Sequence, residues 1–486
     1  MNKIYLDYAA TTPIDPLVKK AMEPYFFEKF GNPSSLHSFG QEAMSTVDKS
    51  REKISKILNA DFREIIFTGS ATEANNLAIR GVVKSFNDFY FRQIALKNIP
   101  QARQLGFSQS ENGAPRAKKI RPLEADYSVS ERQLPEIYQK ILPLRIIVSS
   151  IEHESILDTC RDLEKNGVEI IHIPVNREGI IDLKKLKSSL NERTILVSIM
   201  YANNEIGTIQ PIAKISKIIN EFKARNFASQ KDGVSLAQPL VRPLDSRPRS
   251  SRFAGDHARS ASETLFLETK FRAFYPLFHT DAVQAFQFLD CDVNKLGVDL
   301  ITLSAHKIYG PKGIGLLYAR AQNSRLQILS PIITGGGQEF GLRSGTENVP
   351  SIIGFNKAIE LADKNREKET KRISELSDYF WREIKKIFPK AEINGFKTQD
   401  LIFRVPNIIN ICFPDQKADG LLMKFDFNGI AVSSGSACSA RASKISHVLK
   451  AMEIPENKIK SSLRFSFGKF TTKKELTNAI KILNQF

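Results

Sequence analysis

The stretch SAHKIYGPKG, residues 304–313, follows the apolar run LITL at 300–303 and is the starting point for interpreting the whole chain. A short apolar run that ends in a glycine- and proline-rich turn is typical of a buried strand leading into a functional loop. Lys307 stands in this turn between a histidine and an isoleucine, outside any cluster of charges. A lysine held in such surroundings can lose its proton and form a Schiff base. A lone lysine in a loop is more often simply solvated, so the other residues of the chain must decide between a solvated lysine and one that binds a cofactor.

Outward from this stretch, strand patterns alternate with helical patterns. Strands are predicted at 146–149, 168–173, 194–201, 278–281 and 300–304, with helices between most of them. Such alternation predicts a mostly parallel sheet flanked by helices, and ligands of these sheets bind at the carboxyl ends of the strands. Seven polar residues fall at these ends, namely His153, Asn204, Asp281, Gln284, Ser304, His306 and Lys307.

The bulk composition narrows the class of protein. The chain has 486 residues, 42% of them hydrophobic, which is enough for a large core and for two or three domains. It shows neither an eighteen-residue apolar run nor a charged and then apolar leader, so we expect neither a membrane span nor secretion. The four cysteines are widely spaced and form no CxxC motif, which argues against a disulfide framework or a zinc ribbon. A reducing, cytoplasmic location fits best.

The net charge of +17 at first favours a nucleic-acid-binding protein. However, residues 84–145 contain 11 Lys or Arg against 6 Asp or Glu, and residues 223–272 contain 10 against 5. Two segments within these ranges, about 86–144 and 228–276, lose the regular pattern and are rich in polar residues and proline. Connections in such folds normally need only a few residues, so we interpret both segments as surface insertions, partly disordered. Much of the excess charge therefore belongs to the insertions, and nucleic-acid binding becomes an accessory possibility.

The stretch FTGSATEANN, residues 67–76, has the form of a strand, a small-residue turn and a helix. Free backbone N–H groups and a hydroxyl at a helix N-terminus can hold a phosphate, and Thr72 is placed for that role. An ordinary capped helix remains the alternative. The glycine and lysine spacings of a Walker loop or of a dinucleotide fingerprint are missing.

One cysteine differs from the other three in its surroundings. Cys438 lies in SSGSACSARAS, residues 433–443, where nothing packs against it and where Arg441 and Lys444 would favour a thiolate. The remaining cysteines, at positions 160, 291 and 412, stand in apolar patterns typical of core residues. Arg464 is a charge within an apolar strand pattern, which suits either a fork for a carboxylate ligand or a structural ion pair.

Together these residues suit pyridoxal phosphate. Lys307 would hold the cofactor, Asp281 would pair with the pyridine nitrogen so that the ring becomes an electron sink, and His153 could stack on the ring and move protons. The phosphate would be held by Thr72, Ser304 and His306.

The sequence resembles the cysteine desulfurases of the NifS/IscS group, within the class V aminotransferase family of fold-type I enzymes. The matching stretches follow the family order from residue 4 to about residue 474: YLDYAATTP, GNPSS, FTGSATEANNLAI, EHESI, NNEIGTIQPI, HTDAVQ, SAHKIYGPKGIG, GGGQEFGLRSGTENVP, SSGSACSA and LRFSFGKF. The resemblance implies a seven-stranded, mostly parallel sheet flanked by helices in a large domain, residues 13–365, interrupted by the two insertions. It also implies a smaller α+β domain made of residues 1–12 and 366–486.

The resemblance further implies a role for each matching residue. Lys307 would be the Schiff-base lysine and His153 the stacking acid and base. Arg464 and Asn204 would bind the substrate, and Cys438 would form a persulfide and serve as a transient iron–sulfur ligand. The cofactor would be bound by Ala71, Thr72, His153, Asn204, Asp281, Gln284, Ser304, His306, Lys307 and, from the partner subunit of a homodimer, the residue equivalent to Thr346.

The activity implied is conversion of L-cysteine to L-alanine, with the sulfur passed to a scaffold or other acceptor protein for iron–sulfur cluster assembly and tRNA thiolation. The SSGSAC loop is similar to that of the longer-looped subgroup. Members of that subgroup often extend further than Phe486, so the mode of scaffold docking stays open. A selenocysteine lyase, another class V enzyme and a basic RNA- or partner-binding protein with an idle enzyme core are the alternatives.

Overall fold

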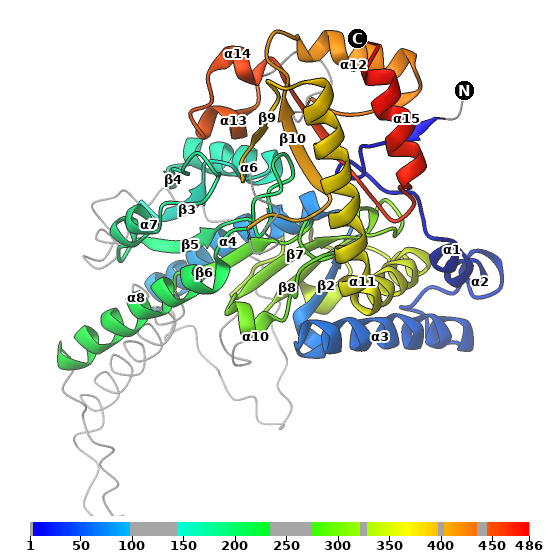
Figure 1. Cartoon of the computed structure of the whole chain (residues 1–486). Coiled ribbons are helices and arrows are strands. Elements are labelled where there is room, and N and C mark those ends of the chain that lie inside the picture. The colour runs from blue at the N-terminus through cyan, green and yellow to red at the C-terminus, as the bar shows by residue number, and fades with distance from the viewer. Residues whose placement is uncertain are drawn as a thin grey trace, which may run out of the picture.

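The computed structural model describes residues 3–97, 143–233, 275–320, 328–396, 403–434 and 445–485. Its centre is a seven-stranded sheet in the order β2-β8-β7-β6-β5-β3-β4 (Figure 1). Only β8 among these strands runs antiparallel to its neighbours, so the predicted mostly parallel seven-stranded sheet is confirmed. The strands are β2 (Ile65–Thr68), β3 (Arg145–Ser149), β4 (Glu169–Ile173), β5 (Thr194–Ser198), β6 (Leu277–Asp281), β7 (Leu300–Ser304) and β8 (Gly315–Ala319).

The sheet is buried on both faces. Successive side chains of a strand point to opposite faces, and here Ile147 packs into one core cluster while its neighbours Ile146 and Val148 pack into another. Burial of both faces explains why these strands read as unbroken apolar runs. One cluster includes α3 (Ser38–Leu58), α8 (Ile212–Gly233) and α11 (Val349–Ile387), and the other includes α4 (Ala71–Lys97) and α6 (Glu154–Lys165).

Helices cover both faces of this sheet (Figure 1). Among the described residues no helix is long and apolar enough to cross a bilayer. The helices of this part of the chain are α1 (Pro16–Met22), α2 (Pro24–Phe27), α3 (Ser38–Leu58), α4 (Ala71–Lys97), α6 (Glu154–Lys165), α7 (Leu183–Ser189), α8 (Ile212–Gly233), α10 (Val293–Leu296) and α11 (Val349–Ile387), with single 3-10 turns η1 (Phe62–Glu64), η3 (Ala305–Lys307) and η4 (Glu339–Gly341).

The C-terminal region forms a smaller α+β layer above the sheet (Figure 1). The N-terminal strand β1 (Ile4–Tyr5) joins it by pairing with β11 (Ile430–Ala431). The long helix α11 runs without a break across residue 365, so the sequence-based division between domains at this position stays a prediction. The other elements are β9 (Glu392–Asn394), β10 (Ile408–Cys412), β12 (Ser462–Ser466), α12 (Ala418–Phe427), α13 (His447–Ala451), α14 (Glu456–Ile459) and α15 (Lys473–Leu483), with the strands in the order β12-β10-β9.

Two helices reach into the segments expected to be insertions. Helix α4 continues to Lys97 and α8 to Gly233, past the predicted starts at about 86 and 228. The rest of both segments, and with it most of their basic charge, lies largely outside the described residues. Strand β6 follows the second segment and still pairs in register with β5 and β7, through Leu277 opposite Leu196 and His279 opposite Leu300. Asp281 therefore stands at the end of a regular strand.

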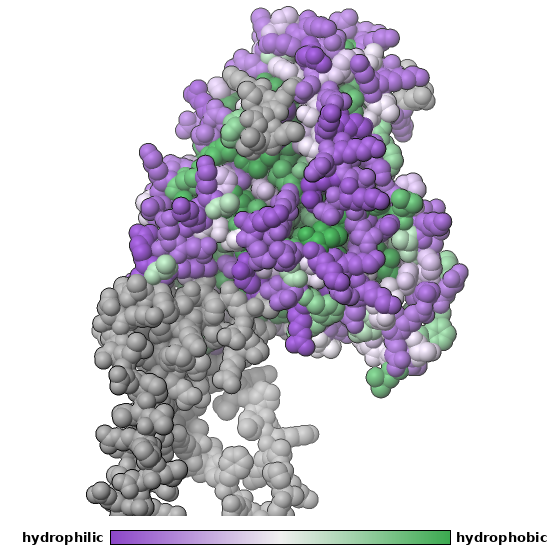
Figure 2. Space-filling view, turned by 60° about the horizontal axis from the view of Figure 1, so that its bottom comes forward, coloured by the Kyte–Doolittle hydropathy of each residue, from purple (hydrophilic) through white to green (hydrophobic). Residues whose placement is uncertain are grey.

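Figure 2 shows one face that is largely hydrophilic, with hydrophobic residues gathered near its middle. Several large apolar side chains are nevertheless exposed between residues 14 and 39, among them Phe27 at 85% and Leu36 at 91%. Such a concentration on a chain with a well-filled core is typical of a surface that meets another molecule.

Candidate active site

The predicted site residues gather at the carboxyl edge of the large sheet. Thr68 at the end of β2 and Ser304 at the end of β7 both lie opposite Gly315, the first residue of β8. A Cβ atom on Gly315 would stand 2.4 Å from the carbonyl carbon of Ser70, so only glycine lets β8 pass the start of α4 this closely. The 3-10 turn η3 follows β7 at once and carries His306 and Lys307 over the same edge.

Lys307 is half-buried beneath the N-terminal segment of the chain. Its Nζ donates hydrogen bonds to the carbonyl oxygens of Ala9, at 2.6 Å, and of Ala10, at 2.8 Å. Gln284 Nε2 donates to the same Ala9 oxygen at 2.9 Å. The segment that precedes α1 therefore brings together two of the predicted cofactor residues.

His306 is held by the same segment. Its Nδ1 lies 3.1 Å from Thr11 Oγ1, and Thr12 Oγ1 donates to its backbone oxygen at 3.0 Å. Burial, together with the positive charges of Lys307 and Lys312, lowers the pKa of His306 to about 4. The imidazole is therefore neutral near pH 7 unless an anion binds beside it, since an anion would favour the charged form.

Asp281 is buried and fully anchored. Its Oδ1 accepts a hydrogen bond from the Val283 N–H at 3.0 Å, and its Oδ2 accepts one from Asn75 Nδ2 at 2.9 Å. Both oxygens thus receive hydrogen bonds from within the chain. A carboxylate is the group that a protonated pyridine nitrogen requires as a partner.

His153 caps the N-terminus of α6, close to Asp281. Its Nδ1 accepts from the Ser155 N–H at 3.1 Å and lies 2.9 Å from Ser155 Oγ. Asn75 Nδ2 in turn donates to Ser155 Oγ at 2.9 Å and to Asp281. The two residues predicted to face the cofactor ring are therefore joined by one short chain of hydrogen bonds.

The start of α4 has the features expected of an anion site. Helix α4 begins at Ala71, and the Glu73 N–H bonds to Ser70 Oγ at 3.1 Å. The N–H groups of Ala71 and Thr72 point from the first turn, where helix N–H groups have no intrahelical acceptor, and no acceptor for them occurs among the described residues. These donors, with the positive end of the helix, suit a phosphate.

Arg464, on β12, is almost completely buried at 3% exposure. Its Nη1 donates to the backbone oxygen of Asn204 at 2.8 Å, and its Nη2 pairs with Asp7 Oδ1 at 2.7 Å. Its Nε has no partner in the described part of the chain. The structural ion pair that the sequence left as an alternative is thus present, and these two contacts use only two of the five N–H groups of the guanidinium, which leaves the Nε–H and one N–H on each terminal nitrogen for a ligand.

The segment that carries Cys438, residues 435–444, lies outside the described residues, whereas both of its flanks lie at this site. Before it, Ser433 and Arg464 exchange two backbone hydrogen bonds, of 3.2 and 2.7 Å. After it, Ser446 Oγ donates to Glu205 Oε2 at 2.6 Å, and His447 Nε2 lies 2.9 Å from the backbone oxygen of Glu152. Burial raises the pKa of the thiols of Cys160 and Cys291 to about 12, as expected of core cysteines.

Thr346 stands apart from the other predicted residues of this chain. It is exposed and ends a glycine-rich loop that is anchored by a buried bidentate ion pair. Arg51 Nη1 and Nη2 lie 2.7 and 2.8 Å from the two oxygens of Glu339. The loop also reaches α4, because Arg343 Nε donates to Glu73 Oε1 at 2.8 Å. An exposed position on a fixed loop suits a residue that acts on a second molecule.

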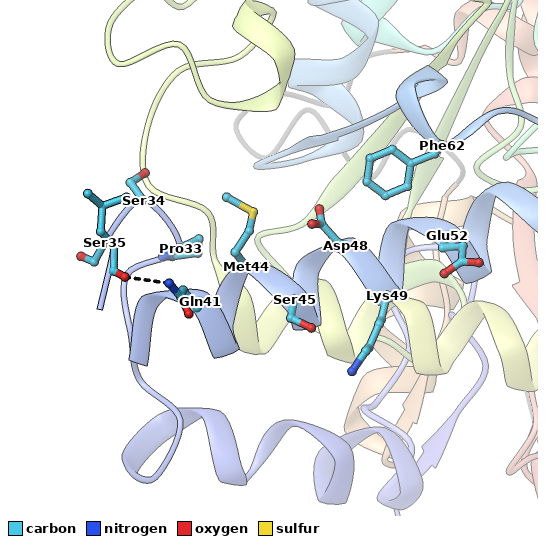
Figure 3. A pocket seen from close by; sticks show the side chains of 11 residues that line it. Pro33, Ser34, Ser35, Gln41, Met44, Ser45, Asp48, Lys49, Glu52 and Phe62 are labelled. Atoms are coloured by element: carbon cyan, nitrogen blue, oxygen red, sulfur yellow. Dashed lines mark hydrogen bonds between the residues drawn. The ribbon is translucent and has the colours of Figure 1, made fainter. Parts of the chain in front are cut away.

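Two further features bear on where ligands bind. An open surface pocket of about 580 Å³ lies between the loop at 33–36, helix α3 and Phe62 (Figure 3). None of its lining residues belongs to the predicted site. No group of three metal-ligating side chains occurs in the part of the chain that the structure describes. The predicted iron–sulfur role of Cys438 falls outside that part.

Comparison with known proteins identifies the family. The model of the family "Aminotransferase class-V" matches residues 4–89, 144–237 and 269–478. A protein described as cysteine desulfurase IscS from Dictyoglomus turgidum is 37% identical over 484 residues, covering 100% of this chain and 94% of the relative. The chain belongs to the cysteine desulfurases of the class V aminotransferase family. The unmatched stretches, 90–143 and 238–268, fall within the two segments expected to be insertions.

Solved structures agree with this family assignment. A protein described as "NifS-like" superimposes with a TM-score of 0.71 at 28% identity, covering 100% of this chain and 99% of that one. Another, described as SspA in complex with cysteine, gives a TM-score of 0.64 at 27% identity, covering 97% of this chain and 100% of that one. The expected fold-type I architecture is therefore confirmed.

As a member of this family the chain is a pyridoxal-phosphate-dependent enzyme. The chemistry of the side chains gathered here fits that cofactor. A buried carboxylate at Asp281 suits a protonated ring nitrogen, an amine at Lys307 suits an aldehyde, and the open N–H groups at the start of α4 suit a phosphate. Ser304 and His306 lie at the same edge of the sheet.

Three residues of the site were not predicted from the sequence. Asn75 and Ser155 form the connection between His153 and Asp281. Glu152 is completely buried, accepts only the Met200 N–H at 2.8 Å, and leaves its Oε2 without a partner among the described residues. Burial, with a smaller contribution from the charge of Asp281, raises the pKa of Glu152 well above its usual range. In the folded protein this shift favours the neutral form of the acid.

Glu152→Gln provides a test of that neutral acid. Unfolding restores a normal carboxyl pKa, near 4.5, so the folded protein binds the extra proton above that pH. The wild-type protein must then lose stability relative to the Gln variant as the pH rises, by at most about 1.4 kcal/mol per pH unit. Urea denaturation between pH 5 and 8 measures this difference. The exposed Glu164→Gln should show no such trend, and a constant difference for Glu152→Gln would show that the acid is ionised.

Proposed function

We propose that the chain converts L-cysteine to L-alanine and holds the released sulfur as a persulfide on Cys438. An acceptor protein then takes the sulfur for iron–sulfur cluster assembly and for tRNA thiolation. The observation that carries this proposal is the position of the two flanks of the Cys438 segment, at Arg464 on one side and at Glu205 and Glu152 on the other. Both ends of the segment start from the rim of the site that contains Lys307 and His153.

The residues around the cofactor site have separable tasks. When bound, pyridoxal phosphate draws electron density from the substrate Cα, so that the α-proton and the sulfur can be removed. Lys307 would hold the cofactor and take the α-proton, because an amine near apolar surroundings can act as a base. Asp281 would keep the ring nitrogen protonated, and Gln284 and Asn204 would lie near the ring oxygen.

Arg464 would bind the carboxylate of the incoming cysteine. Arg464→Lys is expected to raise KM for cysteine by about tenfold to a hundredfold, since a lysine cannot present two parallel donors to a carboxylate. The matched control is Arg372→Lys, because Arg372 is a partly buried arginine that bonds the backbone oxygens of Gly468, Lys469 and Thr471. Steady-state kinetics with cysteine measure both. An unchanged KM in the Arg464 variant would contradict the assigned role.

The sulfur step balances without any outside oxidant. The Cys438 thiolate would attack the sulfur of the bound cysteine, so an S–S bond forms while the substrate C–S bond breaks. The electron pair of that bond stays with the carbon, which takes up a proton and leaves as part of alanine. The transferred sulfur, now at the oxidation level of a persulfide, passes to an acceptor thiol, or leaves as sulfide when a thiol reductant is added.

The experiment that tests this function is a visible spectrum of the purified protein with and without L-cysteine, followed by measurement of sulfide and alanine. We expect a yellow protein, a spectral change on addition of cysteine, and equal amounts of alanine and of sulfide once dithiothreitol is present. Selenocysteine and an amino acid/keto acid pair are tested in parallel. Turnover of either of these without turnover of cysteine would overturn the proposal in favour of another class V activity.

The working unit that we propose is a cytoplasmic homodimer in which Thr346 of each chain contacts the cofactor phosphate of the other. Two observations support it. Thr346 is exposed on a loop anchored by the Arg51–Glu339 ion pair, and the region from residue 14 to residue 39 exposes several large apolar side chains. Light scattering of the purified protein should give twice the mass of one 54.7 kDa chain.

A further inference from the structure

In the series of hydrogen bonds between His153 and Asp281, the donors and acceptors can be assigned in only one way. Asn75 Nδ2 lies 2.9 Å from both Ser155 Oγ and Asp281 Oδ2. A carboxylate can only accept hydrogen bonds, and an amide nitrogen can only donate them. The amide must therefore face Asp281 with its nitrogen, and its two hydrogens are used by Asp281 and Ser155.

The orientation of the Asn75 amide leaves its oxygen without a hydrogen-bond partner among the described residues. The Asn75 side chain is completely buried. A buried acceptor without a partner destabilises the folded protein. An asparagine that served packing alone could be replaced by an apolar residue without that cost. The arrangement instead presents both amide hydrogens to the two polar groups beside it.

The direction continues to the imidazole of His153. Ser155 Oγ already accepts from Asn75, so its own hydrogen is available for His153 Nδ1, 2.9 Å away. The Ser155 backbone N–H points at the same nitrogen from 3.1 Å. A nitrogen that receives two donors cannot carry a hydrogen of its own. The hydrogen of the neutral imidazole must therefore be on Nε2.

We propose that Asn75 and Ser155 are positioning residues that set the tautomer of His153 and the orientation of the Asp281 carboxylate together. In this arrangement His153 enters the reaction as a proton donor at Nε2, and the carboxylate of Asp281 stays oriented for the cofactor ring. The roles of His153 and Asp281 toward the cofactor rest on the proposed function. The tautomer itself depends only on the hydrogen bonds of this chain.

The test is nitrogen NMR of the cofactor-free chain labelled with ¹⁵N-histidine. The sequence contains seven histidines, so the signals of His153 must be assigned. A His153→Gln spectrum assigns the signals. In the wild-type protein we expect His153 Nδ1 to appear as an unprotonated nitrogen and Nε2 as a protonated one. A protonated Nδ1 in the wild-type protein would overturn the proposal without the need for any variant.

Asn75→Asp should reverse the direction of donation in the hydrogen bonds that join Asp281, Ser155 and His153. An oxygen at the position of Nδ2 takes the hydrogen of Ser155, so Ser155 Oγ presents a lone pair to His153. The ratio of the Nδ1-protonated to the Nε2-protonated form should then rise about tenfold, the effect of one reversed hydrogen bond. Ser155→Ala should change the ratio in the same direction but less, which provides a second variant if the first does not fold.

Asn76→Ala is the matched control. Asn76 is the next residue of the same helix, and its side chain bonds Thr72, Arg80 and Thr159 instead of Asp281. We expect the His153 signals of this variant to match the wild type. If a folded Asn75→Asp variant, checked by its melting temperature, also keeps the wild-type ratio, Asn75 has only a packing role. Because no cofactor or cysteine is present, failure of the desulfurase proposal would leave this result unaffected.

Discussion

Lys307→Ala is expected to lower the rate of alanine formation from cysteine by at least about three orders of magnitude, because in the proposed mechanism one amine would both hold the cofactor and move the α-proton. In the structure this amine lies within hydrogen-bonding distance of the carbonyl oxygens of Ala9 and Ala10. Those contacts place it beside Gln284 and above the strand end that carries Ser304.

Loss of the covalent link can be measured separately from loss of activity. Borohydride treatment followed by intact-mass measurement should show one cofactor attached per chain in the wild-type protein and none in the Lys307 variant. Lys20→Ala, an exposed change on α1, is the matched control and should behave as the wild type. Attachment of the cofactor to the Lys307 variant at the wild-type level would disprove the assignment.

Cys438→Ala is expected to abolish release of sulfide and transfer of sulfur, again by at least about three orders of magnitude, while leaving the cofactor spectrum and its first response to cysteine intact. The reason is that the nucleophile acts only after the substrate has bound. The variant therefore separates the two halves of the proposed function. Sulfide production by the variant at the wild-type rate would exclude a persulfide at this position.

Thiol labelling supplies the control for that variant. Burial raises the pKa of Cys160 and Cys291 to about 12, and Cys412 is also completely buried with a raised pKa. Thiols in this state react slowly, because the thiolate is the reactive form. Iodoacetamide at pH 7 should therefore modify the folded wild-type protein once per chain, and the Cys438 variant not at all. Modification of the variant would mean that a second thiol is accessible.

Much of the site could be predicted because its residues follow strands directly. Asp281, Ser304 and Lys307 lie at or just beyond the ends of β6 and β7, where the sequence pattern changes from an apolar run to a turn. The parallel arrangement then brings these ends to one edge of the sheet. The seven-stranded sheet was predictable for the same reason, since strands buried on both faces leave a continuous apolar signal.

Other parts of the site leave no such signal. Asn75 lies inside α4 and Ser155 in the first turn of α6, where the sequence suggests an ordinary helix residue and an ordinary cap. Only the packing of α4 against α6 and β6 makes them partners. The contacts of Lys307 with Ala9 and Ala10 use backbone oxygens, which carry no sequence signature. The ion pair of Arg464 could not be distinguished from a ligand fork, because its partner Asp7 is 457 positions away.

The pairing of β1 with β11 has a consequence for how the chain folds during its synthesis. Ile4 lies opposite Ile430, and the residues just after β1 cover Lys307. At a synthesis rate of roughly 5–20 residues per second, β1 waits about 20–90 s after leaving the ribosome before its partner strand exists. Until then the residues that cover Lys307 lack the strand pairing that holds β1 in the C-terminal layer. We therefore expect the enclosure of Lys307 to be completed late in synthesis, after β11 has left the ribosome.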